Sequence, residues 1–141
     1  MAQLNPFARF NDGKCREAMN FYKKCFGGEL TFMTLGESPM AKDSPKEQHN
    51  LIMHAELKAD GIVFSGSDRF RDKGVIGDNV GMSLNCNSEK EIKELFSMLS
   101  EGGEVFMPLE DAYWGALFGM VTDKYGVEWM LNFQKKPNSS K

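Results

Sequence analysis

The pattern of apolar and polar residues along the chain occurs twice. Residues 17–30 read EAMNFYKKCFGGEL, and residues 94–105 read ELFSMLSEGGEV. Both segments pass from an amphipathic helical stretch through Gly-Gly and Glu to an aliphatic residue. An internal repeat of this kind indicates that one structural unit is used more than once. The chain is therefore expected to contain two related modules.

In the first half, the spacing of the apolar residues predicts one helix among four strands. Asp12 or Asn11 is expected near the N-cap of the helix, and Gly27-Gly28 ends it through the left-handed conformation that glycine adopts cheaply. The polar segment 36–50 contains two prolines and is expected to be the longest and most mobile loop. The expected elements are a strand over 6–11, a helix over 14–26, and strands over 29–35, 51–57 and 62–67.

The second half follows the same order. Ser88 and Glu91 form an S-x-x-E capping box at the start of a helix, and Gly102-Gly103 ends that helix. Residues 110–117 are expected to form a loop. The expected strands cover 80–86, 104–109, 118–122 and 127–134. The chain is thus expected to be a single domain over 1–141, made of βαβββ modules over 5–68 and 79–134, with a flexible tail over 135–141.

Each module is expected to place its helix on one face of a small, mostly antiparallel sheet and to leave the other face open. The fold class is thus α+β, with tandem βαβββ modules that form a cupped mixed sheet around a shared cleft. Side chains alternate across a strand, so each strand has a packed set and an open-face set. The packed set of segment 51–57 is Leu51, Met53, Ala55 and Leu57. The residues expected on the open face are Ile52, His54, Glu56, Gly81, Ser83, Asn85, Glu128, Met130 and Asn132.

Charge and composition exclude several classes of function. The net charge of −3 and the pI near 5.4 disfavour a nucleic-acid partner, which is typically bound through a basic face. No apolar run approaches the roughly 20 residues of a membrane span, and no signal peptide is recognised at the N-terminus. Cys15, Cys25 and Cys86 form no CxxC motif and are expected to be buried packing residues. Free thiols suit a reducing compartment, so a cytoplasmic location is expected.

Several longer motifs carry a resemblance to a known family. These are FYKKCFGGEL at 21–30, MHAEL at 53–57, SGSD at 65–68, MPL at 107–109 and WGALFGMVTDKYGVEWMLN at 114–132. In these segments the chain resembles the vicinal oxygen chelate superfamily, which includes glyoxalase I, bleomycin-resistance proteins and extradiol dioxygenases. The closer resemblance is to the PhnB-like branch, and it spans nearly the whole chain. It implies the glyoxalase-like fold and a homodimer.

The resemblance also implies where a metal would be held. Metal-dependent members place His, Gln or Glu ligands on the first and last strands of each module. Those positions correspond here to Phe7, Ser65, Gly81 and Met130, none of which is a usual ligand of a hard or borderline divalent metal. No metal or other cofactor is therefore expected. The alternative is a divalent metal at non-standard positions that include His54.

His54 is the strongest single candidate for chemistry, because it lies on the expected open face. Imidazole can act as a general base or a metal ligand near neutral pH, although a hydrogen-bonded wall residue is the plainer interpretation. His49, in the loop, is expected to be exposed to solvent. Arg9 can hold an anionic group of a ligand, but a surface salt bridge is the plainer interpretation. A pair between Arg9 and Glu56 would have a structural role.

Aromatic and sulfur-containing side chains supply the remaining candidates for ligand binding. Tyr113, Trp114 and Phe118 are expected either to line an apolar pocket or to bury a dimer contact. Phe106 and Met107 are expected in the wall of the same pocket, and Met130, on the expected open face, is a further candidate for ligand binding.

Three functions are open at this point. The preferred hypothesis is a metal-free protein that binds a small, partly apolar molecule in the cleft between the modules, with neither nucleic acid nor membrane as a partner. The second is a metal-dependent lyase, isomerase or dioxygenase of the same fold that uses His54. The third is a drug-sequestering protein of the bleomycin-resistance type.

Overall fold

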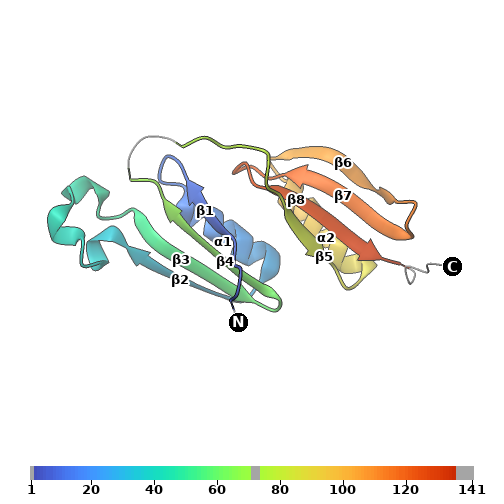
Figure 1. Ribbon diagram of the computed structural model, residues 1–141, viewed down its shortest axis with the longest axis horizontal. Coiled ribbons are helices and arrows are strands. Elements are labelled where there is room, and N and C mark those ends of the chain that lie inside the picture. The colour runs from blue at the N-terminus through green and yellow to red at the C-terminus, as the bar shows by residue number, and fades with distance from the viewer. Residues whose placement is uncertain (1, 71–73, 136–141) are drawn as a thin grey trace. The chain divides into compact units, whose positions relative to one another are not determined.

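A computed structural model of the chain describes residues 2–70 and 74–135. It contains two compact units, Met1–Val75 and Ile76–Lys141. Each unit has one α-helix and one four-stranded mixed sheet, in the order β-α-β-β-β (Figure 1). The predicted α+β class and the repeat of the βαβββ unit are therefore confirmed. Of the tail expected over 135–141, residues 136–141 lie outside the described residues.

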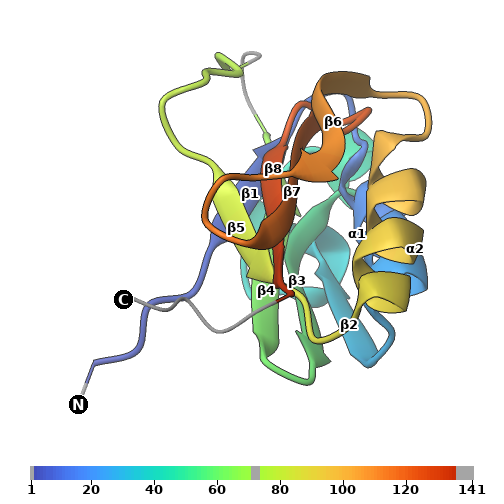
Figure 2. The same cartoon turned by 90° about the vertical axis from the view of Figure 1, so that its right-hand side faces the viewer.

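The first unit is built on a sheet with the strand order β1-β4-β3-β2. The pair β1–β4 is parallel, and the pairs β3–β4 and β2–β3 are antiparallel. The helix α1 packs on one face of this sheet (Figure 2) and leaves the other face open. The elements are β1 (Phe7–Phe10), α1 (Cys15–Phe26), β2 (Glu29–Thr34), β3 (Ile52–Ala59) and β4 (Ile62–Asp68).

The second unit repeats this topology with the strand order β5-β8-β7-β6. Its first and last strands, β5 and β8, are again the parallel pair, and α2 again packs on one face. In the described part of the chain, no helix is long and apolar enough to cross a membrane. The elements are β5 (Met82–Asn85), α2 (Glu89–Ser100), β6 (Glu104–Asp111), β7 (Ala116–Thr122) and β8 (Glu128–Gln134).

The amphipathic stripe predicted for the first helix forms the core of its unit. Its members Ala18, Met19 and Tyr22 are fully buried, and α1 contacts β2, β3 and β4. The ring of Tyr22 lies 5.0 Å from that of Phe64 on β4. Each large side chain buried in this way stabilises the fold by about 1.5–3 kcal/mol. This packing fixes which face of the sheet is left open.

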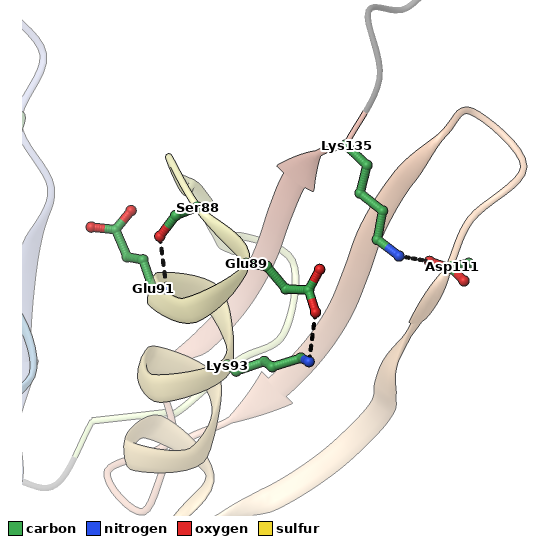
Figure 3. Close-up of polar contacts among 6 residues, drawn as sticks. All are labelled: Ser88, Glu89, Glu91, Lys93, Asp111 and Lys135. Carbon is green, nitrogen blue, oxygen red and sulfur yellow. Dashed lines mark hydrogen bonds and ion pairs between the residues drawn. The ribbon is translucent and has the colours of Figure 1, made fainter.

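The predicted capping box at α2 is present in a shifted form (Figure 3). Ser88 Oγ accepts a hydrogen bond from the backbone N–H of Glu91 at 3.0 Å, as a capping box requires. The carboxylate of Glu91 accepts from the backbone N–H of Asn87 at 2.7 Å, one residue before the cap. A Glu89–Lys93 ion pair follows on the helix surface, and Lys135 pairs with Asp111 beside it.

The expected cap of α1 is wrong. The N-cap residue is Lys14, and its side chain makes no capping hydrogen bond. The first helical N–H, that of Cys15, donates instead to Asp68 Oδ1 at 2.9 Å. Asp68 Oδ2 accepts from the backbone N–H of Ile52 at 2.8 Å, and the side chain is buried. One carboxylate at the end of β4 therefore connects the start of α1 to the start of β3.

The two glycines of each Gly-Gly pair have different structural roles. The first members, Gly27 and Gly102, both have φ 73°. Gly27 combines this φ with ψ −156°, so the helix ends in an extended conformation open to glycine and not in the predicted left-handed one. The second members, Gly28 and Gly103, lie against backbone: a Cβ built on either would be 2.2 Å from a carbonyl oxygen, that of Lys58 or Thr122 respectively. The repeated motif thus combines a turn with a close approach between backbones.

The segment 36–50 is folded more tightly than the sequence predicted. One 3₁₀ turn, Leu35–Glu37, spans its start, and two more, Ala41–Asp43 and Lys46–Gln48, lie within it. His49 is half-buried rather than exposed, because its Nε2 donates to the carbonyl of Ala41 at 2.9 Å. Gln48 Nε2 donates to the carbonyl of Phe70 at 3.0 Å and ties the segment to the end of the first unit.

A β-bulge changes the face assignment at the start of β3. On β2 the register shifts between Met33, which pairs with His54, and Thr34, which pairs with Ile52. Alternation would place Ile52 on the open face, but its side chain is 1% exposed and belongs to the core, whereas Met53 is only half-buried. The expected faces of Ile52 and Met53 are therefore wrong, because a bulge interrupts the period of two.

Candidate functional site

The open face of the second sheet lies opposite α2. Ser83 and Met120 both pair with Met130, so a polar and an apolar residue flank it on the neighbouring strands. Trp129 and Leu131, on the other face of β8, are buried, as the predicted alternation requires. The open face comprises Ser83 and Asn85 on β5, Glu128, Met130 and Asn132 on β8, and Phe118, Met120 and Thr122 on β7.

Trp114 is fixed on this face by two hydrogen bonds. Its indole Nε1 donates to Asn132 Oδ1 at 3.1 Å, and its backbone carbonyl accepts from Gln134 Nε2 at 2.9 Å. The Phe118 ring lies 5.3 Å away at 71°, an edge-to-face arrangement. Trp114 and Phe118 thus form an aromatic wall over the neighbouring strand β8.

The loop that carries Trp114 is shorter than predicted. Because β6 extends to Asp111 and β7 begins at Ala116, the expected loop over 110–117 shrinks to residues 112–115. The backbone N–H of Ala112 donates to Ala116 O at 2.8 Å and closes the turn. Tyr113, at the tip, is 97% exposed and touches only the edge of the Trp114 ring in the described contacts, at 4.9 Å between centroids. The structure does not bring Tyr113 into the wall.

A pocket of about 250 Å³ opens further along the same face. Its apolar part includes Met120 and Phe106, a residue that is 73% exposed. Asp78 and Glu128 add two carboxylates to its rim. The pocket does not include Trp114 or Phe118. The lining residues are Asp78, Phe106, Met120, Val121, Thr122, Glu128 and Trp129.

The open face of the first sheet has a different chemical character. His54 is exposed, and its ring lies 6.1 Å from the ring of Phe7. Within residues 2–70 and 74–135 its imidazole makes no hydrogen bond. Ser65 pairs with both Phe7 and Glu56, and Ser67 pairs with Arg9, so the hydroxyls of β4 lie in the centre of this face.

The Arg9–Glu56 pair, considered from the sequence as a structural alternative, is not among the ion pairs of the described residues. The Arg9 guanidinium lies over the Phe7 ring, 5.4 Å from its centroid. Glu56 instead forms an ion pair with Lys58, with 3.6 Å between Nζ and Oε1. Lys58 follows Glu56 by two residues on β3, so the two side chains extend from the same face of the strand.

The positions implied for a family metal can be compared with the strand register. Phe7 pairs with Ser65 in the first sheet, and Ser83 pairs with Met130 in the second. Ser83, rather than Gly81, is thus the counterpart of Phe7. Phenylalanine, serine and methionine side chains do not fit a hard or borderline divalent ion. Among the described residues, no three His, Cys, Asp or Glu side chains are grouped to hold a metal.

The two buried cysteines do not supply a nucleophile to either face. Cys15 and Cys86 are buried, as predicted, whereas Cys25 is half-buried. Burial, and then the charge of Asp68, raises the pKa of the Cys15 thiol from 9.0 to about 12. Burial, and then Glu91, raises the pKa of Cys86 from 9.0 to about 11. Both thiols are therefore protonated and weakly reactive at neutral pH.

These raised pKa values predict a loss of stability in alkali. The unfolded thiols ionise above pH 9, while the folded thiols stay protonated up to pH 11–12, so the free energy of unfolding decreases as pH rises. Each thiol is expected to contribute a loss of about 1 kcal/mol between pH 8 and pH 10. Urea unfolding at both pH values, compared between the wild type and Cys15→Ala, isolates one thiol. An equal pH dependence in both proteins would contradict the raised pKa of Cys15.

Sequence reasoning found part of these two faces. Met130 and Asn132 were identified from alternation, and Phe118 was identified as an aromatic residue next to the expected loop. All three lie on the open face. Met120 was missed, although the alternation of β7 would have placed it two residues after Phe118. Ser67 was noted within the SGSD motif but was given no role of its own. Asp78 lies in a charged connection without periodicity.

Comparisons with known proteins agree with the fold. The sequence model of the family described as "Glyoxalase/Bleomycin resistance protein/Dioxygenase superfamily" matches residues 3–131. Protein YjdN of Escherichia coli (strain K12) is 28% identical over 94% of this chain and 96% of its own length. The similarity thus extends across both units.

Two solved structures are similar over nearly the whole chain. Protein PA1353 from Pseudomonas aeruginosa is 36% identical, with a TM-score of 0.77 over 94% of this chain and 98% of that one. A Bacillus cereus protein described as a putative 3-demethylubiquinone-9 3-methyltransferase, PhnB protein, is 26% identical. Its TM-score is 0.75, over 94% of this chain and 99% of that one.

Proposed function

Because the chain belongs to the glyoxalase/bleomycin resistance/dioxygenase superfamily, in its PhnB-like branch, we propose that it binds a small, partly apolar molecule. The open face of the second sheet is the proposed binding surface, and the usual superfamily metal is not required. The observation that carries this proposal is the apolar surface formed by Trp114, Phe118, Met120 and Met130 beside the pocket at Phe106. The cleft expected between the modules stays a prediction.

The side chains of this face suit a compact ligand. Aromatic rings contribute large apolar areas, and the thioethers of Met120 and Met130 adapt their shape to different partners. The pocket volume of about 250 Å³ lies just below the usual range of roughly 300–1,000 Å³ for small-molecule sites. A ligand of fragment size therefore fits the pocket, and a larger one would extend over Met130 toward the aromatic wall.

A neutral apolar dye tests the proposal. Nile red is expected to gain fluorescence with the wild-type protein, and Phe106→Ala is expected to raise its Kd at least fivefold. Val105→Ala is the matched control, because Val105 is also partly exposed on β6 but is not among the residues that line the pocket. The proposal fails if the dye does not bind, or if the two variants bind it equally.

The metal-dependent alternative is tested by metal analysis of the purified protein. Zinc, nickel, manganese or iron bound at one ion per chain and lost in His54→Ala would favour an enzyme that uses His54. Metal content well below one ion per chain would support the metal-free proposal. The homodimer is likewise a proposal, which light scattering checks, and the cytoplasmic location stays a prediction.

A further inference from the structure

We propose that the open face of the first sheet binds a small oxoanion, either a carboxylate or a phosphate group, between Arg9 and the hydroxyls of Ser65 and Ser67. This site goes beyond the proposed function, because it lies on a different sheet and recognises charge rather than apolar surface. It also requires no metal and no catalytic step.

The two serines on β4 are the observation that points to a ligand. Ser65 is 8% exposed and Ser67 is 6% exposed. In the described part of the chain, neither hydroxyl has a hydrogen-bond partner. Neither oxygen is completely buried, because Arg69 Nε is the single fully buried side-chain N or O atom without a partner among the described residues. The two hydroxyls therefore keep a small opening to solvent, through which a ligand can reach them, while most hydroxyls this deep in a fold already have a partner. Two such groups on alternate positions of one strand point to the same face and can donate to one bound oxygen-rich group.

Arg9 provides the positive charge for this group. It pairs in register with Ser67 across the parallel strands β1 and β4. Its guanidinium is exposed, stacks on Phe7 at 5.4 Å, and forms no ion pair within the described residues. Guanidinium groups bind carboxylate and phosphate through two parallel N–H···O bonds, so both ligand classes fit this geometry.

The surrounding charges are compatible with an anion. Glu56 pairs in register with Ser65, but its carboxylate is within 3.6 Å of Lys58 Nζ, which offsets its charge. Asp68, the next acidic residue on β4, is turned to the helix side, where it accepts from the N–H groups of Cys15 and Ile52. His54 lies on the same face as Glu56 and adds a further polar group.

Titration with inorganic phosphate and with acetate, followed by NMR, tests the site. Saturable shifts of the amide signals of Ser65, Ser67 and Arg9 are expected with at least one of the two anions, at constant ionic strength against chloride. Whichever anion binds more tightly identifies the ligand class. Arg9→Gln is expected to weaken that binding at least tenfold. The absence of saturable shifts with both anions would overturn the proposal.

Arg16→Gln is the matched control. Arg16 also stacks on a phenylalanine, with its guanidinium 4.9 Å from the centroid of Phe32, but it is on α1, away from the buried hydroxyls. The variant removes the same charge and a similar stacking contact, so phosphate and acetate affinity should stay within twofold of the wild type. An equal loss of affinity in Arg9→Gln and Arg16→Gln would show a general charge effect and overturn the site.

Ser67→Ala separates binding from folding. Removal of an unpaired buried hydroxyl is expected to leave Tm equal or higher, while the affinity for the anion decreases severalfold. A lower Tm with unchanged affinity would show that Ser67 has a structural role and would contradict the proposal. Phe106→Ala should leave anion affinity unchanged, so failure of the dye experiment and failure of this one are distinguishable.

Discussion

Replacement of Gly103 by alanine is expected to lower the free energy of unfolding by about 3 kcal/mol. The added Cβ would be 2.2 Å from the carbonyl oxygen of Thr122 and 2.9 Å from the Cα of Asp123. Both atoms belong to backbone at the end of β7, so relief of the overlap requires β6 and β7 to separate. Urea denaturation followed by circular dichroism measures the loss.

The neighbouring glycine is the matched control. Gly102→Ala introduces a side chain at φ 73°, where a Cβ would be 3.3 Å from the flexible Lys124 side chain. Its expected cost is about 1–2 kcal/mol, that of a left-handed non-glycine residue. Gly28→Ala and Gly27→Ala repeat the comparison in the first unit, where Gly28 also has φ 86°. Equal losses at the two positions of a pair would show that the backbone contact does not limit the fold.

The second large effect is expected for Asp68→Asn, which should destabilise the protein by about 3 kcal/mol. The two carboxylate oxygens accept from the N–H groups of Cys15 and Ile52, and the side chain is 3% exposed. An amide places its NH₂ group against one of these donors, so a buried N–H loses its acceptor. The remaining bond is also weaker, because the acceptor has lost its charge.

Asp60→Asn controls for the change of charge alone. Asp60 is exposed in the turn between β3 and β4, and Asn-Gly suits such a turn as well as Asp-Gly. A change within about 0.5 kcal/mol is expected for this variant. Thermal and urea unfolding of both variants give the comparison. If Asp68→Asn were as stable as Asp60→Asn, the buried carboxylate could not be what holds α1 to β3.

Local patterns predicted the elements of this fold, and distant contacts explain where those predictions failed. Helical spacing identified α1 and α2, and Ser88 was identified as a cap because its acceptor and donor are three residues apart. The cap of α1 was missed because its acceptor, Asp68, lies 53 positions from Cys15. The second glycine of each pair was explained only by carbonyl oxygens that come from other strands of the sheet.

The candidate sites show the same division. Alternation identified the open-face residues of β8, since that strand runs without a bulge. It failed at Ile52, because β3 contains one at Met53. The hydrogen bond between Trp114 and Asn132 was not predicted, because residues 110–117 were interpreted as a loop. Glu110 and Asp111 are instead the last residues of β6, a strand at the edge of the sheet. They are exposed and still pair with β7.

The parallel pairing of the first and last strands has a consequence for synthesis on the ribosome. Phe7 pairs with Ser65, so β1 leaves the exit tunnel long before its partner exists. At translation rates of roughly 5–20 residues per second, this delay of roughly 60 residues lasts about 3–12 s. During that interval the nascent strand has no neighbour to pair with. The first module can therefore complete its sheet only as a unit, after β4 has emerged. The second module has a shorter wait of the same kind, because Ser83 pairs with Met130.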